Sequence, residues 1–374
     1  MKRIFRSILI GTAVYGVIFL LLFFSEEVTS GVQKGISVCL SLMIPSTFLF
    51  LILTDVLSKS RAGVLLARPF FFLSKLFRIR RCDVDIVVLS LIGGYPVGAR
   101  ILADRVKSGQ IDKKSASRML AFCVNSSPAF LYTGIGISLF HSAAVGCIFL
   151  ASSLFACLIT GAVSRIGAFY PEADNTASNA KAKISPSVML FSAVKKGVQS
   201  MALICGFVVL FSACMPLFST FLSRFLPQEA AACICGLLEV CTGCASLFSS
   251  GYQNPIAAAM LFSSFGGVCV FLQIGAMLHG SGVSMRPLLL WRAFYSAAAT
   301  GLTVFLSRFL PPDTLSAFSA FSDTQPVRSS VSPAAVCALL CCMILLLFFS
   351  VHPATIKIKE KSSYGKRRQE AGSK

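Results

Sequence analysis

Charged residues are scarce in this chain of 374 residues, because only 13% are Asp, Glu, Lys or Arg while 55% are hydrophobic. A soluble domain carries about 25% charged residues to solvate its surface. Histidine and tryptophan are also rare, and no HExxH, GxSxG, Walker or dinucleotide-binding pattern occurs. The composition excludes a soluble globule. The missing motifs argue against an enzyme and against a self-contained ATP-driven pump, so we expect no catalytic residues.

A metal-ligand or disulfide framework is also missing, although the chain has 15 cysteines. Most of them lie inside apolar runs, and none is spaced with histidines as in zinc sites. Cys241 and Cys244 form a single CxxC pair, for which helix packing is favoured over redox or metal chemistry. We therefore expect neither a metal nor a cofactor.

What the chain does contain is a series of apolar runs long enough to cross a hydrocarbon core of about 30 Å. The first follows basic residues but lacks a small-residue cleavage site, so it indicates a retained anchor. Two other apolar stretches, 86–107 and 230–250, are interrupted by glycine and polar residues, which predicts re-entrant or broken helices. The fold class is thus an all-α polytopic membrane protein with about eight transmembrane helices plus these two segments. The eight predicted spans are 8–24, 36–57, 117–140, 142–164, 198–222, 255–279, 288–310 and 333–351.

The distribution of the 34 Lys and Arg residues sets the expected orientation. With the amino terminus inside, nearly all of them fall on the inner face, Arg286 and Arg292 included. Only Lys34, Arg224, Arg308 and Arg328 remain outside. The positive-inside rule favours this topology, which places both termini in the cytoplasm and makes the lipid bilayer the partner of the basic residues. The net charge of +19 therefore indicates no nucleic-acid partner.

The two halves of the chain resemble one another. A constant offset of 141 relates Met119, Phe130 and Gly134 to Met260, Phe271 and Gly275. Because the predicted topology starts the two units on opposite faces, we expect inverted repeats, as in many secondary transporters. The expected organisation is an anchor helix (1–30), a first repeat (31–170), a cytoplasmic linker (171–190), a second repeat (191–310), a polar insertion with the last helix (311–356) and a basic cytoplasmic tail (357–374).

The first broken segment is the main candidate for substrate binding. Three glycines and a proline within eight residues cannot continue a helix, and the break exposes helix-end amides that attract an anion. The alternative is a tight helix crossing through the GxxxG spacing of Gly94 and Gly98. The candidate residues here are Gly93, Gly94, Tyr95, Pro96, Gly98 and Arg100.

The second broken segment carries Glu239, a carboxylate within apolar sequence that costs about 3 kcal/mol unless it faces a cavity, pairs or is protonated. Thr242 and Gly243 share its helical face. A substrate or coupling-ion role competes with a structural hydrogen bond to a helix end. Asn125, Ser126 and Gln273 are candidates to line a path from both repeats, with helix packing as the equal alternative.

Several motifs resemble those of the sporulation integral membrane protein YlbJ family, in the wider group with nucleoside-recognition (Gate) domains. The resemblance covers roughly residues 30 to 310, and it rests on GGYPVGARILADRVKSGQI, MLAFCVNSSPAF, GLLEVCTGCASLFSSG and SFGGVCVFLQ. It implies a similarity to concentrative nucleoside transporters and a role in spore cortex and core maturation.

The same resemblance implies transport of dipicolinic acid or a similar small anion across the outer forespore membrane. A dianion would meet repulsion from ionised Glu239, which suggests proton coupling. The alternatives are a transporter of nucleosides or another metabolite, and a non-transporting scaffold of a sporulation complex. A homo-oligomer is plausible by analogy with related transporters.

Overall fold

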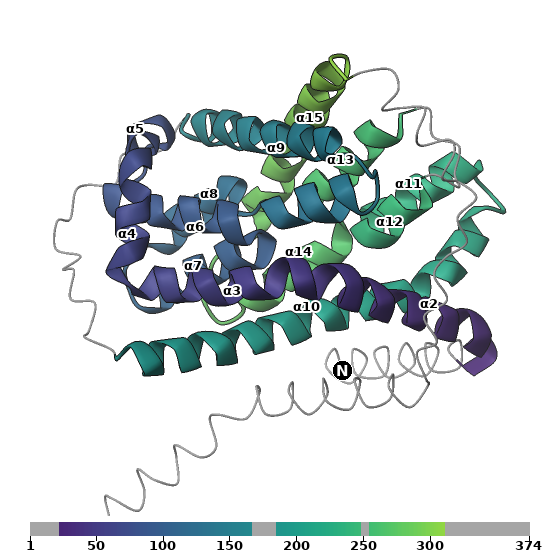
Figure 1. Ribbon diagram of the computed structural model, residues 1–374, viewed down its shortest axis with the longest axis horizontal. Coiled ribbons are helices and arrows are strands. Elements are labelled where there is room, and N and C mark those ends of the chain that lie inside the picture. The colour runs from purple at the N-terminus through teal and green to yellow at the C-terminus, as the bar shows by residue number, and fades with distance from the viewer. Residues whose placement is uncertain (1–21, 167–184, 248–253, 311–374) are drawn as a thin grey trace, which may run out of the picture.

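The computed structural model describes residues 22–166, 185–247 and 254–310, and all regular structure in these ranges is helical (Figure 1). In the first half the elements are α2 (Ser25–Val38), π-helix η1 (Cys39–Met43), α3 (Ile44–Lys59), α4 (Arg61–Ala67), η2 (Arg68–Phe70), α5 (Phe72–Phe77), η3 (Arg81–Asp83), α6 (Val84–Gly93), α7 (Tyr95–Lys107), α8 (Lys113–Cys123), π-helix η4 (Phe130–Ile137) and α9 (Ala143–Ser164). In the second half they are α10 (Pro186–Leu222), α11 (Gln228–Leu238), α12 (Val240–Ser246), α13 (Pro255–Phe265), α14 (Gly267–Leu278) and α15 (Arg286–Ser307).

Within the described ranges, five helical stretches are long and apolar enough to cross a membrane: Ser25–Lys59, Ala143–Ser164, Ser187–Leu222, Pro255–Leu278 and Arg286–Ser307. They overlap the predicted spans 36–57, 142–164, 198–222, 255–279 and 288–310. The predicted spans 8–24 and 333–351 lie outside the described residues, except for positions 22–24. The all-helical, multi-pass membrane class is confirmed. The count of eight crossings and the inverted arrangement of the repeats stay predictions.

Large apolar side chains on the outer faces of these helices are exposed rather than packed. Leu49, Phe155, Leu210 and Leu290 are each more than half exposed. A soluble monomer rarely exposes so much contiguous apolar surface, whereas lipid tails solvate it at no cost. The outer surface is therefore that of a membrane protein.

The predicted helix over 117–140 is wrong, because the chain is interrupted in its middle. Helix α8 ends at Cys123, Val124 is extended with φ −116° and ψ 92°, and helical structure returns only at Pro128. Pro128 lacks an N–H and disfavours the helical conformation of Ser127 before it. The Asn125 side chain takes over part of the backbone bonding by donating to the Phe122 carbonyl at 2.8 Å.

Both predicted broken segments are interrupted. Gly94 separates α6 from α7 with φ 82° and ψ −166°, a conformation that disfavours residues with a side chain. Glu239 separates α11 from α12 in an extended conformation. A further interruption at Gly266, with φ 88°, divides 255–279 into α13 and α14. Each half therefore contains, in the same order, a long helix, two interrupted segments and a final helix.

Local sequence explains where several helices begin. Ser142 caps α9 by accepting from the Val145 amide, and Asn254 caps α13 by accepting from the Ala257 amide at 3.0 Å, with Pro255 in the first turn. Asp112 caps α8 by accepting from the Ser115 amide at 2.8 Å. These capped starts fix the direction in which each helix enters the bundle.

The interrupted segments occupy the middle of the molecule. In Figure 1, α9 runs along one long edge and α10 along the other, and α6, α7, α8, α11, α12 and α14 lie between them. Helix α10 packs against α2 and α3, while α9 packs against α15. This arrangement surrounds the interrupted segments with protein, as their unpaired backbone groups require.

Candidate functional site

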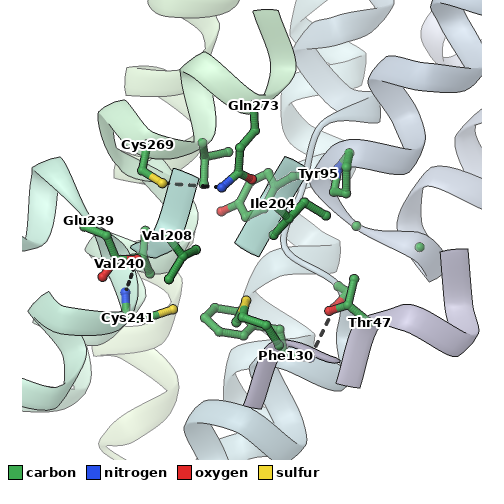
Figure 2. A pocket seen from close by; sticks show the side chains of 16 residues that line it. Thr47, Tyr95, Phe130, Ile204, Val208, Glu239, Val240, Cys241, Cys269 and Gln273 are labelled. Carbon is green, nitrogen blue, oxygen red and sulfur yellow. Dashed lines mark hydrogen bonds between the residues drawn. The ribbon is translucent and has the colours of Figure 1, made fainter. Parts of the chain in front are cut away.

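The interruptions of both halves meet at one cavity of ≈ 60 Å³. In Figure 2, Glu239 lies on one side of it and Tyr95 and Thr47 lie on the other, with Gln273 between them. The wall is largely apolar, with a few polar groups from distant parts of the chain. It is formed by Met43, Thr47, Gly93, Gly94, Tyr95, Pro96, Ser127, Phe130, Ile204, Val208, Glu239, Val240, Cys241, Cys269, Val270 and Gln273.

Gly94 forms the edge of the cavity because of its backbone and because of its neighbour. Its positive φ already disfavours any side chain, and a Cβ there would lie 2.9 Å from the Ser127 amide nitrogen. The two interruptions of the first half therefore pack directly against each other. Gly93 and Pro96 flank this contact and also line the cavity.

Tyr95 connects this edge to the second half of the chain. Its hydroxyl donates to the Ser263 carbonyl of α13 and accepts from the Ser126 hydroxyl at 2.7 Å. The Ser126 hydroxyl also lies 2.7 Å from the Ser263 carbonyl. The predicted residues Tyr95 and Ser126 thus form one hydrogen-bond network across the two halves, and only Tyr95 reaches the cavity wall.

Glu239 is buried, with 2% of its surface exposed, and its carboxylate caps the helix that it precedes. One oxygen accepts from the Cys241 amide at 3.0 Å and the other from the Thr242 amide at 2.5 Å. A carboxylate at a helix N-terminus is stabilised by these amides and by the helix dipole. Of the two interpretations of Glu239, the structure shows the hydrogen bond to a helix end. Its position on the cavity wall leaves the coupling role as a proposal.

Gln273 projects into the middle of the cavity from α14 (Figure 2). Its amide nitrogen lies 3.4 Å from the sulfur of Cys269, one turn earlier on the same helix, which is a weak interaction. Cys269 and Cys241 both line the cavity as free thiols. Gln273 is therefore a polar group on the wall of a largely apolar cavity.

Arg100 lies away from the cavity wall, in contrast to the role expected for it. Its guanidinium is 3.3 Å from the Asp55 carboxylate and donates to the Ser200 hydroxyl at 2.9 Å. Asp55 also pairs with Lys59. Arg100 thus connects α7 to α3 and α10. Asp55 was not predicted as part of this contact, although a carboxylate within the apolar run 36–57 is a visible signal.

The expectation of free helix-end amides at the first break is also corrected. Pro96 has no N–H, and the amides of Val97 and Gly98 donate back to the Gly94 carbonyl at 3.1 and 3.4 Å. The start of α7 therefore presents few unpaired donors to an anion.

The remaining predicted residues occupy packing positions outside the cavity wall. A Cβ on Gly98 would lie 1.7 Å from the Cys123 carbonyl oxygen, and one on Gly243 would lie 2.1 Å from the Gly236 Cα. Asn125 is fully buried, and its amide nitrogen donates to the Phe122 carbonyl and lies 3.6 Å from the Cys157 sulfur on α9. The backbone amide of Thr242 donates to the Glu239 carboxylate, and Thr242 does not line the cavity.

Arg292 is the largest departure from the sequence-based view, which assigned it to the inner face. The structure buries it inside the bundle with 1% of its surface exposed. Its guanidinium donates to the carbonyls of Phe265, at 3.0 Å, and Val124. Val124 and Phe265 lie at the ends of helical segments, one in each half of the chain. They are 141 positions apart, which is the same offset that relates the similar residues of the two halves. An arginine inside the apolar run 288–310 was the signal that could have identified it.

Comparisons with known proteins give one distant relative. No protein-family model and no solved structure matches the chain, so membership of the nucleoside-recognition (Gate) group stays a prediction. Among curated proteins, the chain is similar to the sporulation integral membrane protein YlbJ of Bacillus subtilis (strain 168), with 24% identity over 204 residues. The match covers 48% of this chain and 49% of the relative, so it spans about half the length of that protein.

Proposed function

We propose that this protein is a transporter of a small anion, of which dipicolinate is the first candidate, in the outer forespore membrane of a sporulating cell. The observation that carries the proposal is the meeting of helix interruptions from both halves at one cavity. The similarity to a protein named as a sporulation integral membrane protein supports the cellular setting.

Interrupted helices at membrane depth favour transport over a purely structural role. Each interruption leaves backbone groups without helical partners, which is costly in lipid and tolerated where the segment lines a cavity. Secondary transporters place such discontinuous helices from two repeats around a central substrate site. The shared order of elements in the two halves, together with the opposite orientation inferred from charge, supports inverted repeats.

The cavity is smaller than most sites that hold a small molecule. Small-molecule sites typically measure about 300–1,000 Å³, whereas this cavity has ≈ 60 Å³. A solute would therefore enter only after the surrounding segments move apart. The glycines at two of the interruptions, Gly94 and Gly266, are positions where the backbone changes direction without a side-chain clash.

Uptake of labelled dipicolinate into proteoliposomes, compared with uptake of a labelled nucleoside, tests the proposal. Wild-type protein should show saturable dipicolinate uptake. Gln273→Ala, which removes the central polar group, should lower the rate about tenfold, the effect of one lost buried hydrogen bond. Gln110→Ala is the matched control, because Gln110 is exposed and remote from the cavity wall.

The possible outcomes separate the alternatives. Saturable nucleoside uptake without dipicolinate uptake would support the transport function and show that the substrate is a nucleoside rather than dipicolinate. Folded protein that moves no solute under any imposed gradient would reject transport in favour of a membrane scaffold.

A further inference from the structure

Arg292 is a buried cation without an anionic partner in the described part of the chain. No Asp or Glu of residues 22–166, 185–247 or 254–310 lies within ion-pair distance of its guanidinium. Two carbonyl oxygens accept from Nε and Nη1, and Nη2 is buried with no hydrogen-bond partner in these ranges. The guanidinium is therefore held in place by two hydrogen bonds, while its third nitrogen has no hydrogen-bond partner in the described residues.

The surroundings of Arg292 offset its charge only in part. The carbonyls of Val124 and Phe265 belong to the negative ends of helices α8 and α13. The rings of Tyr95 and Tyr295 lie over the guanidinium with centroids at 4.8 and 4.9 Å. Such contacts stabilise a cation, but they do not replace an anion, and an ionisable group inside a membrane bundle indicates a functional site.

Tyr95 contacts both the cavity and Arg292. It lines the cavity, while its ring stacks on the guanidinium. It also follows Gly94 directly and is held by its hydroxyl through the bonds to Ser263 and Ser126. Release of this hydroxyl and rotation of the ring would bring Nη2, the guanidinium nitrogen without a partner in the described residues, into reach of the cavity.

We propose that Arg292 is the anion-binding residue of the transporter, and that Tyr95 covers it in the closed conformation. In this arrangement the Nη1 and Nη2 edge of the guanidinium receives a carboxylate of the solute, a geometry that arginine recognises with two parallel hydrogen bonds. The proposal rests on the transport function proposed above, and it specifies the substrate class as a small carboxylate. A neutral nucleoside would not compensate the charge of the buried guanidinium.

The test compares two ligands of the same shape and different charge on purified protein. Dipicolinate and the neutral pyridine-2,6-dicarboxamide are titrated against wild type, Arg292→Lys and Arg118→Lys by isothermal calorimetry. Arg118 is a matched control, because its guanidinium also donates to two backbone carbonyls and stacks on a phenyl ring, yet it does not line the cavity. Wild type and Arg118→Lys should bind dipicolinate alike and should not bind the dicarboxamide.

Arg292→Lys keeps the positive charge but loses the two parallel N–H donors of the guanidinium, so the affinity for dipicolinate should fall at least tenfold. Tyr95→Phe keeps the ring and removes the hydroxyl bonds, so exposure of Arg292 becomes easier and affinity should rise severalfold. Unchanged dipicolinate binding by Arg292→Lys would overturn the proposal. If that variant fails to fold, unchanged or weaker binding by Tyr95→Phe would overturn it.

The two proposals fail in different ways. Wild-type protein that binds both ligands equally, or that transports only neutral solutes, would overturn the role of Arg292 and leave the transporter intact. Folded protein without transport of any solute would reject the transport function itself.

Discussion

The guanidinium of Arg100 lies 3.3 Å from the carboxylate of Asp55, in a buried contact between α7 and α3. The same guanidinium reaches Ser200 on α10, so that one side chain joins three helices. This ion pair holds the helix that follows the Gly94 interruption against the helices that bear the cavity wall. Arg100 itself does not line the cavity, so we expect it to position α7.

Replacement of Arg100 should accordingly act on stability. Arg100→Gln leaves Asp55 with Lys59 alone and should lower the free energy of unfolding by about 2 kcal/mol, the value of hydrogen bonds to a charged group. Asp55→Asn in the same chain should recover part of this loss, because it removes a buried carboxylate that has lost one of its two cationic partners. Thermal unfolding in detergent measures both. Lost uptake with unchanged stability would instead show direct contact of Arg100 with the solute.

Gly98 should tolerate no side chain. A Cβ there would collide with the Cys123 carbonyl, so Gly98→Ala must displace α7 from α8 and should cost 2 kcal/mol or more, at about the level of severe overpacking. Gly301→Ala is the control, because nothing lies within 4 Å of a Cβ at that helical position. It should be neutral or stabilising by up to about 1 kcal/mol. Equal melting temperatures of the two variants would contradict this packing.

Glu239 allows capping and charge to be tested separately. Glu239→Asp keeps both the carboxylate and a favourable cap, whereas Glu239→Asn keeps the cap and removes the charge. If the carboxylate couples transport to protons, the pH dependence of uptake should persist in the Asp variant and disappear in the Asn variant. If Glu239 acts only as the N-cap of α12, both variants should retain the wild-type pH dependence of uptake. Exposed Glu27→Gln provides the control.

Asp112 should make the start of α8 sensitive to acid. Although partial burial raises it, hydrogen bonds from Ser115 and neighbouring amides lower the pKa of Asp112 overall. A lowered folded-state pKa means that the cap stabilises above the ordinary Asp value of about 3.9 and is lost as the pH falls through the folded value. Asp112→Ala should therefore cost about 1 kcal/mol at neutral pH. The gap in melting temperature from wild type should close at acidic pH, and a constant gap would contradict the role.

The interruption at Gly94 was the most predictable part of this fold, whereas the one at Gly266 was missed, because 255–279 was predicted as one unbroken span. Gly94, with Pro96 close behind it, and Asn254 before Pro255 each behaved as their residue types predict. The interruption at Val124 was missed, although Pro128 marks it, because hydropathy averaged over a long window does not register four extended residues. A hydrogen bond of Glu239 to a helix end was one of two interpretations, but its place as the N-cap of α12 was not predicted, because glutamate is not among the usual N-cap residues.

Charged residues inside the bundle were harder to place. A count of basic residues treats every arginine as part of a loop, and therefore put Arg292 on the inner face instead of between two helix ends. Asp55 was overlooked because its partner Arg100 lies 45 positions away. Such pairs depend on which helices become neighbours, and the order of residues along one chain does not specify that.

Helix α10 connects the surface of the protein to its interior without a break in its backbone. Near one end, Lys196 pairs with Asp104 in an exposed contact at 2.9 Å, and further along Ile204 and Val208 form part of the cavity wall. These positions lie on one continuous helix, so a tilt at the exposed contact moves the wall as well. Exposed ion pairs weaken as salt concentration rises. The salt concentration therefore changes the strength of a contact on the same helix that supplies part of the cavity wall.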